Sequence, residues 1–428
     1  MIFTTGVFAI FLAVVLPVYW LLPCRWRKGF LTVAGMIFYF YSYPLHLLLV
    51  LVMTVVTYLI ALGILRARET EEALPSDENG SGSDLRRAPG AGWPALRAKI
   101  LAVLGICLAA GVLGYFKYWK MVVATLNGIS RHLHHETLFP QPEILVPLAI
   151  SFFTFEFIHF LADVYLGKIR RHQMNFHDYL LFIFFFPTLV SGPIKRYQGF
   201  HEQSEGMPVF RVDDLLEGAK RVILGLAQKF ILADTAGQFT AALATPEQAG
   251  AGALILAVYA YSLKIYFDFA GYSDMAIGLA RMLGFRVPEN FDRPYFQPNI
   301  GEFWRHWHMS LSSWIRDYLY IPLGGNRRGF GRTLFNLVTA FAICGLWHGS
   351  AWNFVAWGLW HGFGLAGYRI WRRCLGDRIP RGGVLLRAVN VFITFHFVTA
   401  GWILFASPSI GSALITFQKI IGAIWRVL

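Results

Sequence analysis

The stretch LHLLLVLVMTVVTYLIALGIL, residues 45–65, decides the class of fold because it contains no Asp, Glu, Lys or Arg. A helix needs about 20 mostly apolar residues to cross the hydrocarbon core of a bilayer, and this stretch supplies them. The pattern recurs and predicts further membrane helices at residues 3–22, 30–43, 100–118, 144–166, 179–190, 221–239, 253–283, 334–345, 352–371, 386–405 and 410–427. Residues 179–190 and 334–345 are short for a full crossing, so re-entrant or protein-buried segments are the alternative for these two.

The composition of the whole chain agrees with this interpretation. Of the 428 residues, 56% are hydrophobic and 15% are charged, whereas an ordinary soluble domain has roughly 25% charged residues. Disorder is excluded because disordered chains are poor in aromatic residues and this one holds 14 Trp, 18 Tyr and 38 Phe. We therefore expect an all-α polytopic membrane protein with about 10–12 transmembrane or re-entrant helices.

The charge distribution predicts the topology. The net charge of +13 would favour nucleic-acid binding in a soluble protein, but basic loops on the cytoplasmic side of a membrane explain it better. Basic residues gather at 25–28, 66–68 and 168–171, each after an odd number of expected crossings. This pattern places the N-terminus outside the cytoplasm, with membrane lipids and no nucleic acid as partners.

Changes in composition divide the chain into three parts. Residues 1–65 hold the first membrane helices. Residues 66–99 combine acidic side chains with Gly/Ser and Pro/Gly runs, which is typical of a flexible cytoplasmic loop. Residues 100–428 form the expected membrane core.

Residues 281–332 are too polar for a membrane span and too aromatic for an exposed linker. A helix is expected from a cap near Asn299 through Arg316. Its amphipathic stripe consists of apolar residues spaced by three or four: Phe303, Trp307, Leu311, Trp314 and Tyr318. One interpretation is an interfacial helix with its aromatic residues at the headgroups. The positive charge of the segment equally suits a phosphate-bearing substrate such as a coenzyme A thioester.

Two histidines are the main candidates for chemistry. His308 lies in WRHWH and His348 lies between apolar stretches in GLWHGSAW. A histidine at membrane depth is costly to place and is a functional-site hypothesis by default. The alternative is a histidine that satisfies a neighbouring backbone carbonyl. A further polar cluster, His132, His134, His135 and Glu136, is better explained as a solvated loop than as a metal site, and we expect no bound metal.

Six sequence blocks make the chain recognisable. They are FFPTLVSGPI (185–194), YFDFAGYSDM (266–275), NFDRPY (290–295), FWRHWHMSLS (303–312), RDYLYIPLGGNR (316–327) and GLWHG (345–349). In this order they resemble the membrane-bound O-acyltransferase family, and within it the bacterial polysaccharide O-acetylation branch typified by the alginate O-acetyltransferase membrane subunit.

The resemblance implies a fold and a site. It implies helices around a central funnel with cytoplasmic amphipathic helices, in a bacterial cytoplasmic (inner) membrane, and a catalytic region at 281–362. The family's intramembrane histidine corresponds to His348 and its second histidine to His308. Relatives usually have Arg where this chain has His306, to which we assign no role. Candidate donor-binding residues lie nearby: Trp304, Arg305, Trp307, Arg316, Asp317 and Trp347.

The resemblance also implies partners. An acyl thioester, either acetyl-CoA or a phosphopantetheine carrier, would act as co-substrate rather than as a bound cofactor. A separate extracytoplasmic acetyltransferase and the polysaccharide export machinery would receive the acetyl group.

Acyl transfer suits these residue types because a base must remove the hydroxyl proton as the oxygen attacks the thioester. Imidazole, with an ordinary pKa near 6.5, is matched to this task at neutral pH. We assign His348 as the general base and expect His308 to orient the thioester carbonyl or stabilise the oxyanion. Two alternatives stay open: D-alanyl transfer toward teichoic acid from a carrier-protein thioester, and a transporter with an ionisable pathway through His348. The absence of a detectable sequence repeat counts against the transporter.

Overall fold

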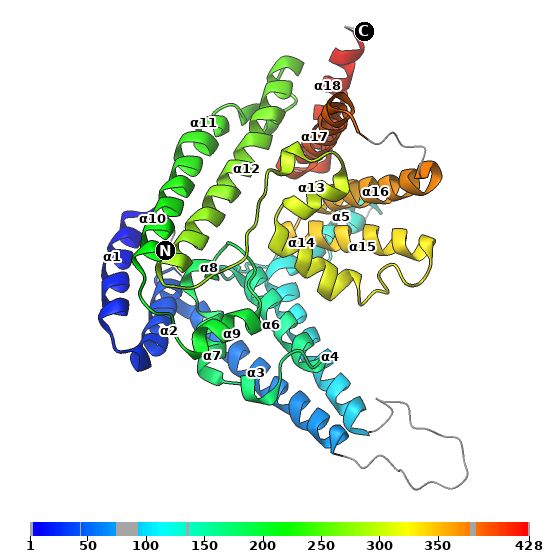
Figure 1. Ribbon diagram of the computed structural model, residues 1–428. Helices are drawn as coiled ribbons and strands as arrows, with labels where there is room; N and C mark the ends of the chain where they lie inside the picture. Colours follow the sequence, from blue (N-terminus) through cyan, green and yellow to red (C-terminus); the bar gives the residue numbers. More distant parts are fainter. Residues whose placement is uncertain (1–2, 43, 74–92, 134–136, 377–381, 427–428) are drawn as a thin grey trace, which may run out of the picture. The chain divides into compact units, whose positions relative to one another are not determined.

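The structure is a computed structural model that describes residues 3–42, 44–73, 93–133, 137–376 and 382–426. Every regular element within these residues is helical (Figure 1), which confirms the expected all-α fold. The α-helices are α1 (Gly6–Leu21), α2 (Cys24–Phe40), α3 (Pro44–Glu72), α4 (Trp93–Leu113), α5 (Trp119–His132), α6 (Ile150–Tyr165), α7 (Phe176–Ile183), α8 (Phe186–Leu189), α9 (Tyr197–Glu205), α10 (Val212–Ala227), α11 (Asp234–Gly237), α12 (Ala251–Met282), α13 (Ile300–His306), α14 (Met309–Ile315), α15 (Phe330–His348), α16 (Trp352–Leu375), α17 (Val384–Ala406) and α18 (Ile410–Trp425).

The chain forms two compact units. The first consists of Met1–Leu215 together with Ala280–Val287, and the second of Leu216–Leu279 together with Pro288–Leu428. The boundaries expected from composition, at residues 65 and 99, stay predictions. Helix α3 continues to Glu72 and α4 begins at Trp93, and residues 74–92 of the expected loop lie outside the described residues.

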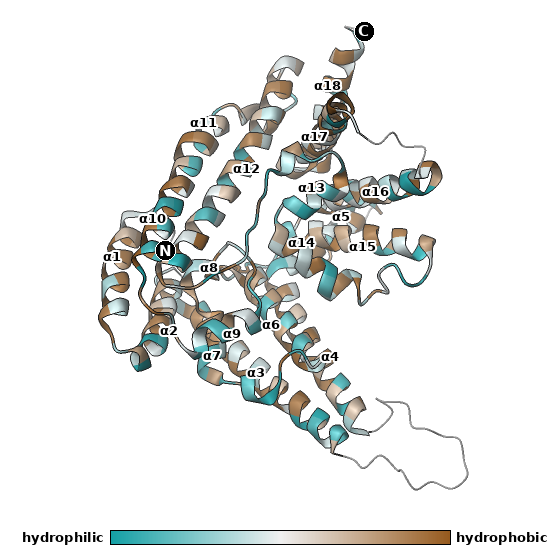
Figure 2. Cartoon of the chain, viewed as in Figure 1, coloured by the Kyte–Doolittle hydropathy of each residue, from teal (hydrophilic) through white to brown (hydrophobic). Residues whose placement is uncertain are grey.

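Several helices are suited to a bilayer. Within the described residues, five are long and apolar enough to cross a membrane: Pro44–Glu72, Trp93–His132, Ala251–Met282, Phe330–His348 and Val384–Ala406. Helices α1 and α18 are apolar but shorter. Figure 2 shows hydrophobic residues along much of the length of many helices, and large apolar side chains such as Ile10 and Leu48 are 69% and 68% exposed. The chain is therefore a multi-pass membrane protein, as its hydropathy predicts.

The short stretch at residues 179–190 follows the protein-buried alternative. Helix α7 ends at Ile183 and the single-turn α8 begins at Phe186, with Pro187 in its first turn. Proline is tolerated there because its missing N–H has no partner within the helix anyway. Residues 181–189 are all buried, Phe184 and Phe185 completely. Hydropathy could not separate this segment from a span, because protein-buried and lipid-facing residues are equally apolar.

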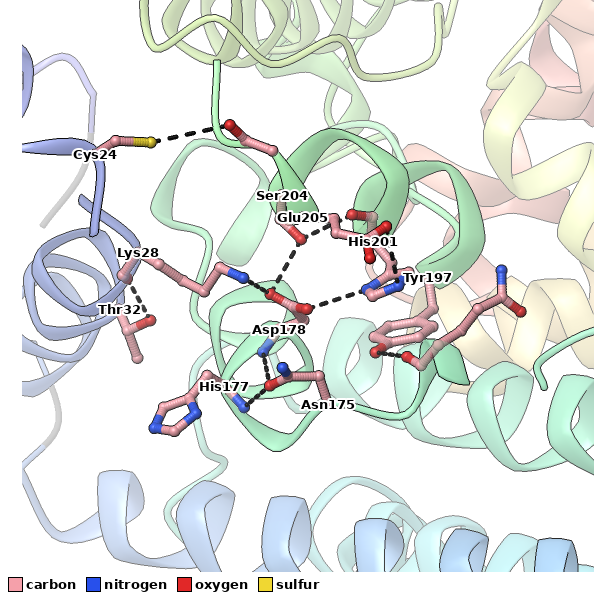
Figure 3. A network of polar contacts seen from close by, with 12 residues as sticks. Cys24, Lys28, Thr32, Asn175, His177, Asp178, Tyr197, His201, Ser204 and Glu205 are labelled. Carbon is pink, nitrogen blue, oxygen red and sulfur yellow. Dashed lines mark hydrogen bonds and ion pairs between the residues drawn. The ribbon is translucent and has the colours of Figure 1, made fainter. Parts of the chain in front are cut away.

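A buried carboxylate joins three helices of the first unit (Figure 3). Asp178 of α7 accepts hydrogen bonds from His201 Nδ1 at 3.1 Å and Ser204 Oγ at 3.2 Å, both on α9. It also forms an ion pair with Lys28 of α2. Ser, His and Asp meet here, but the hydroxyl donates to the carboxylate and not to the imidazole. The cluster therefore lacks the hydroxyl–imidazole contact of an activated nucleophile and serves to hold the helices together.

Replacing Asp178 with asparagine is expected to lower the free energy of unfolding by about 1–3 kcal/mol, because it removes the charge that Lys28 and His201 surround. Thermal unfolding of the purified protein in detergent measures this effect. Glu217→Gln is the matched control, since Glu217 pairs with Lys220 on the surface and such exposed pairs contribute about 0–1 kcal/mol. An Asp178→Asn variant with the melting temperature of the wild type would contradict the structural role.

Candidate active site

The predicted helix over residues 299–316 is wrong at its centre. Its start is confirmed, because the Asn299 side chain caps α13 by accepting from the Glu302 N–H at 2.9 Å. However, α13 ends at His306 and α14 begins at Met309. Between them His308 adopts left-handed backbone angles, φ 42° and ψ 56°, a conformation that costs an L-residue roughly 1–2 kcal/mol. Such strain persists only where the surrounding structure enforces it, and it clusters at functional sites.

Asn290 holds this break in place. Its backbone oxygen accepts from the Met309 N–H at 2.9 Å, and its side-chain oxygen accepts from Ser310 Oγ at 2.6 Å. Its side-chain N–H donates to Ser273 Oγ on α12 at 3.0 Å. Asn290 is 1% exposed, so each of these bonds forms away from water and would be costly to lose. The break between α13 and α14 is thereby attached to α12.

The other histidine stands at the end of a closely packed helix pair. Helices α15 and α16 run beside each other (Figure 1), and His348 is the last residue of α15. Their backbones approach so closely that a Cβ on Gly345 would lie 2.1 Å from the Phe354 oxygen, and one on Gly358 2.2 Å from the Phe341 oxygen. Small residues at such crossings are typical of packed membrane helices. The two glycines thus bring the end of α15 against α16.

The second unit brings both predicted histidines to one place. The His308 ring lies 6.3 Å from the Trp347 ring, and the Trp347 ring lies 4.8 Å from the His348 ring, all between centroids. On its other sides His348 contacts Trp357 of α16 at 5.0 Å and Phe405 of α17 at 5.3 Å. His348 is partly exposed, whereas His308 is 1% exposed. His348 is therefore the more accessible of the two histidines.

The electrostatics of His308 favour its neutral form. Burial, with a smaller contribution from His348, lowers the pKa of His308 well below its usual value of 6.5. Neither ring nitrogen of His308 has a hydrogen-bond partner among the described residues. A neutral imidazole has one N–H donor and one acceptor nitrogen. His308 can thus donate to or accept from a bound group without carrying a charge.

The predicted donor-binding residues fall into two groups. Trp347 lies between the two histidines, and Trp304 reaches the same region because its Nε1 donates to Nδ1 of His361 at 3.3 Å. Trp307 instead packs into an aromatic core, with its ring 5.0 Å from that of Trp402. Trp307 is 3% exposed, and its binding of a donor stays a prediction.

The predicted charged residues lie at the surface. The side chain of Arg305 is 74% exposed and pairs with Glu302 at 2.6 Å. That of Arg316 is 63% exposed and pairs with Asp317 at 2.8 Å. Their binding of a donor stays a prediction. Their exposure does leave them accessible to a polar, phosphate-bearing ligand.

Two residues of the cluster were missed by the sequence reasoning. Trp357 and His361, both on α16, extend it away from His348: their rings lie 5.0 Å apart, and Trp357 contacts His348. A signal was available, because the tripeptide WHG of residues 347–349 recurs at residues 360–362. The second copy lies within the membrane helix that hydropathy predicts over residues 352–371, so its histidine did not stand out.

Within the ranges that the structure describes, no three His, Cys, Asp or Glu side chains gather as a possible metal site. The cluster near His132 was expected to be a solvated loop, and residues 134–136 of it lie outside the described residues.

Comparison with known proteins identifies the family. The sequence pattern of the membrane-bound O-acyltransferase family matches residues 148–406, more than half of the chain. The chain is 37% identical over 412 residues to the probable alginate O-acetylase AlgI of Pseudomonas aeruginosa, which covers 96% of this chain and 73% of that protein. It is 33% identical over 364 residues to the peptidoglycan O-acetyltransferase of Helicobacter pylori, covering 76% of this chain and 65% of the relative.

A third relative transfers a different group. The teichoic acid D-alanyltransferase of Bacillus subtilis is 32% identical over 336 residues, covering 72% of this chain and 84% of that protein. The matched region of the family includes both histidines, the break between α13 and α14, and the crossing of α15 with α16. The chain belongs to the membrane-bound O-acyltransferase family and is an acyltransferase.

Proposed function

We propose that this chain moves an acetyl group from a cytoplasmic thioester, acetyl-CoA, across the membrane for O-acetylation of an exported polysaccharide such as alginate or cellulose. The observation that carries the proposal is the meeting of partly exposed His348 and buried, neutral His308 on either side of Trp347. The likeness to alginate O-acetylases over 96% of the chain supports acetyl as the group and a polysaccharide as its destination.

The chemistry follows from the residues. His348 accepts the proton of an acceptor hydroxyl while the hydroxyl oxygen attacks the thioester carbonyl. The C–S bond then breaks, the acyl group stays on the oxygen as an ester, and the thiol leaves with the proton from His348. His308 orients the thioester carbonyl or stabilises its developing negative charge. Thioester and hydroxyl are both consumed, so the thioester is a co-substrate and not a resident cofactor.

Location and partners complete the proposal. The chain resides in the bacterial cytoplasmic membrane with its N-terminus outside, in keeping with the basic segments at residues 25–28, 66–68 and 168–171. The thioester reaches His348 from the cytoplasm, and a separate extracytoplasmic acetyltransferase passes the acetyl group to the polysaccharide. Arg305 and Arg316, both exposed, are the candidates for contact with the phosphates of the donor.

D-alanyl transfer is the second candidate, favoured by the likeness to a teichoic acid D-alanyltransferase over 72% of the chain. The two functions share the attack of a hydroxyl on a thioester and differ in the donor. The experiment must therefore determine which thioester the protein uses.

The test uses the purified full chain in liposomes, supplied with radiolabelled acetyl-CoA or with a carrier protein loaded with labelled D-alanine. Alginate and a membrane fraction that contains the extracytoplasmic acetyltransferase serve as acceptors. We expect alkali-labile label on the acceptors from acetyl-CoA alone. Label from the D-alanyl carrier alone would replace the proposal by D-alanyl transfer. No label from either donor, in protein that elutes as a single folded species, would contradict thioester-dependent transfer.

A further inference from the structure

Helix α16 carries two buried hydrogen-bond donors that the proposed mechanism does not use. Trp357 is 1% exposed and His361 is completely buried. Neither Trp357 Nε1 nor His361 Nε2 has a hydrogen-bond partner among the described residues. They are four residues apart and so lie on the same face of the helix. A buried polar group without a partner costs about 1–3 kcal/mol, and two on one face call for a common explanation.

The contact with Trp304 determines where the proton of His361 lies. An indole N–H can only donate. Because Trp304 Nε1 lies 3.3 Å from His361 Nδ1, this nitrogen must be the acceptor. The neutral imidazole then carries its proton on Nε2. Trp357 Nε1–H and His361 Nε2–H are therefore two donors, and neither offers a lone pair.

Because the pair offers two N–H groups and no lone pair, its ligand must be an atom that accepts hydrogen bonds. A hydroxyl group or a water molecule would bring hydrogens that find no acceptor on these two atoms. A carbonyl oxygen brings two lone pairs and no proton, and it gains further from N–H donors when it becomes an oxyanion. His308 differs, because its free nitrogens include one donor and one acceptor. Of the two roles proposed for His308, it therefore keeps the orientation of the thioester, and the negative charge is given to the pair on α16.

The position of the pair relative to His348 fits such a role. The Trp357 ring meets the His348 ring edge-on, with centroids 5.0 Å apart. In the reacting complex the attacking oxygen, which contacts the base, is roughly 3 Å from the acyl carbon, and the acyl oxygen is bonded to that carbon. A side chain that donates a hydrogen bond to the acyl oxygen must therefore be a direct neighbour of the base. The Trp357 ring is such a neighbour of His348, and the His361 ring lies 5.0 Å from the Trp357 ring.

We propose that Trp357 Nε1–H and His361 Nε2–H bind the acyl oxygen of the thioester and stabilise the negative charge that it acquires when the hydroxyl attacks the acyl carbon. This inference rests on the proposed acyl transfer at His348 and specifies where the acyl group binds. As the tetrahedral intermediate collapses, the charge returns to form the ester carbonyl and the C–S bond breaks. Trp304 is a positioning residue, because it acts only through the tautomer of His361.

Kinetic comparison of single substitutions tests the pair. Trp357→Phe and His361→Phe keep an aromatic ring and remove the donor, and each is expected to lower kcat by roughly 10²–10³-fold with little change in KM for acetyl-CoA. His361→Gln keeps an N–H near the position of Nε2 and should recover part of the loss. The matched control is Trp360→Phe, since Trp360 Nε1 already donates to the Phe397 oxygen at 3.0 Å. We expect this variant to retain the kcat of the wild type.

A spectroscopic measurement separates binding of the oxygen from packing. The probe is a ketone analogue of acetyl-CoA with a methylene group between sulfur and a ¹³C-labelled carbonyl, bound to the full chain in detergent. Two N–H donors should lower the infrared stretching frequency of this carbonyl in the wild type. The shift should shrink in Trp357→Phe and His361→Phe and persist in Trp360→Phe.

The outcomes are distinct. Wild-type kcat in both phenylalanine variants would overturn the inference, and so would a reduced kcat with an unchanged carbonyl frequency, which assigns the pair to packing. An equal loss in Trp360→Phe would overturn it as well. In each of these cases the wild type still transfers acetyl from acetyl-CoA, so the proposed function survives. If the wild type itself uses no thioester donor, the proposed function fails and this inference fails with it.

Discussion

Substitution of His348 by alanine is expected to lower the rate of acyl transfer by about 10²–10⁴-fold, the typical contribution of a general base. His348 is the partly exposed histidine of the cluster, held at the end of α15 by the Gly345–Gly358 crossing and surrounded by the rings of Trp347, Trp357 and Phe405. The surrounding rings of Trp347, Trp357 and Phe405 cannot accept a proton in place of the imidazole. Label transfer from acetyl-CoA in liposomes measures the loss.

Two further variants make this result interpretable. His348→Gln keeps a polar side chain of similar length but no basic nitrogen, and it should be as inactive as the alanine variant. His172→Ala is the matched control, because His172 is exposed and its loss should leave transfer unchanged. Near-normal transfer by folded His348→Ala protein would show that the base is elsewhere.

The second large effect concerns stability. Lys195→Met is expected to lower the free energy of unfolding by about 3–5 kcal/mol, because it leaves the carboxylate of Glu156 buried without its cation. Lys195 and Glu156 are 2% and 6% exposed, with 2.5 Å between Nζ and Oε1. Lys195 Nζ also lies 4.3 Å from the centre of the Phe182 ring. A loss of this size approaches the total stability of many domains, so less folded protein should accumulate in membranes.

A double variant distinguishes this explanation from simple loss of packing. Lys195→Met combined with Glu156→Leu removes both charges, and apolar replacements of a buried ion pair are often neutral or stabilising. We expect the double variant to be more stable than either single variant in thermal unfolding in detergent. Lys220→Met, at an exposed ion pair, should shift the melting temperature little. A double variant that is no more stable than Lys195→Met would contradict the role of the ion pair.

Much of the fold could be predicted from hydropathy because burial in lipid and burial in protein both require apolar residues. The helices around residues 45–65 and 386–405 were expected and are present as α3 and α17. The same requirement explains why a buried segment was predicted as a membrane span. Residues 179–190 are as apolar as a span but are broken at Phe184 and Phe185 and buried within the first unit.

The predicted helix over residues 299–316 shows another limit of sequence reasoning. Its apolar stripe packs into the protein, with Phe303 at 0% and Leu311 at 1% exposure. The break at His308 follows from hydrogen bonds with Asn290, which is distant in sequence. Histidine is enriched among the few non-glycine residues with left-handed angles, but such residues are rare at any position. The period of the stripe therefore could not reveal the break.

For the site, the sequence by itself determined which residue types carry the chemistry: His308 and His348 stand out because a histidine among apolar residues needs a reason to be there. Only the tertiary structure decided that both lie against Trp347, and that the donors Trp357 and His361 complete the cluster. It also decided that Arg305 and Arg316 lie at the surface. The physical reason is that residue identity records the cost of burying a polar group, whereas its partner depends on which helices pack together.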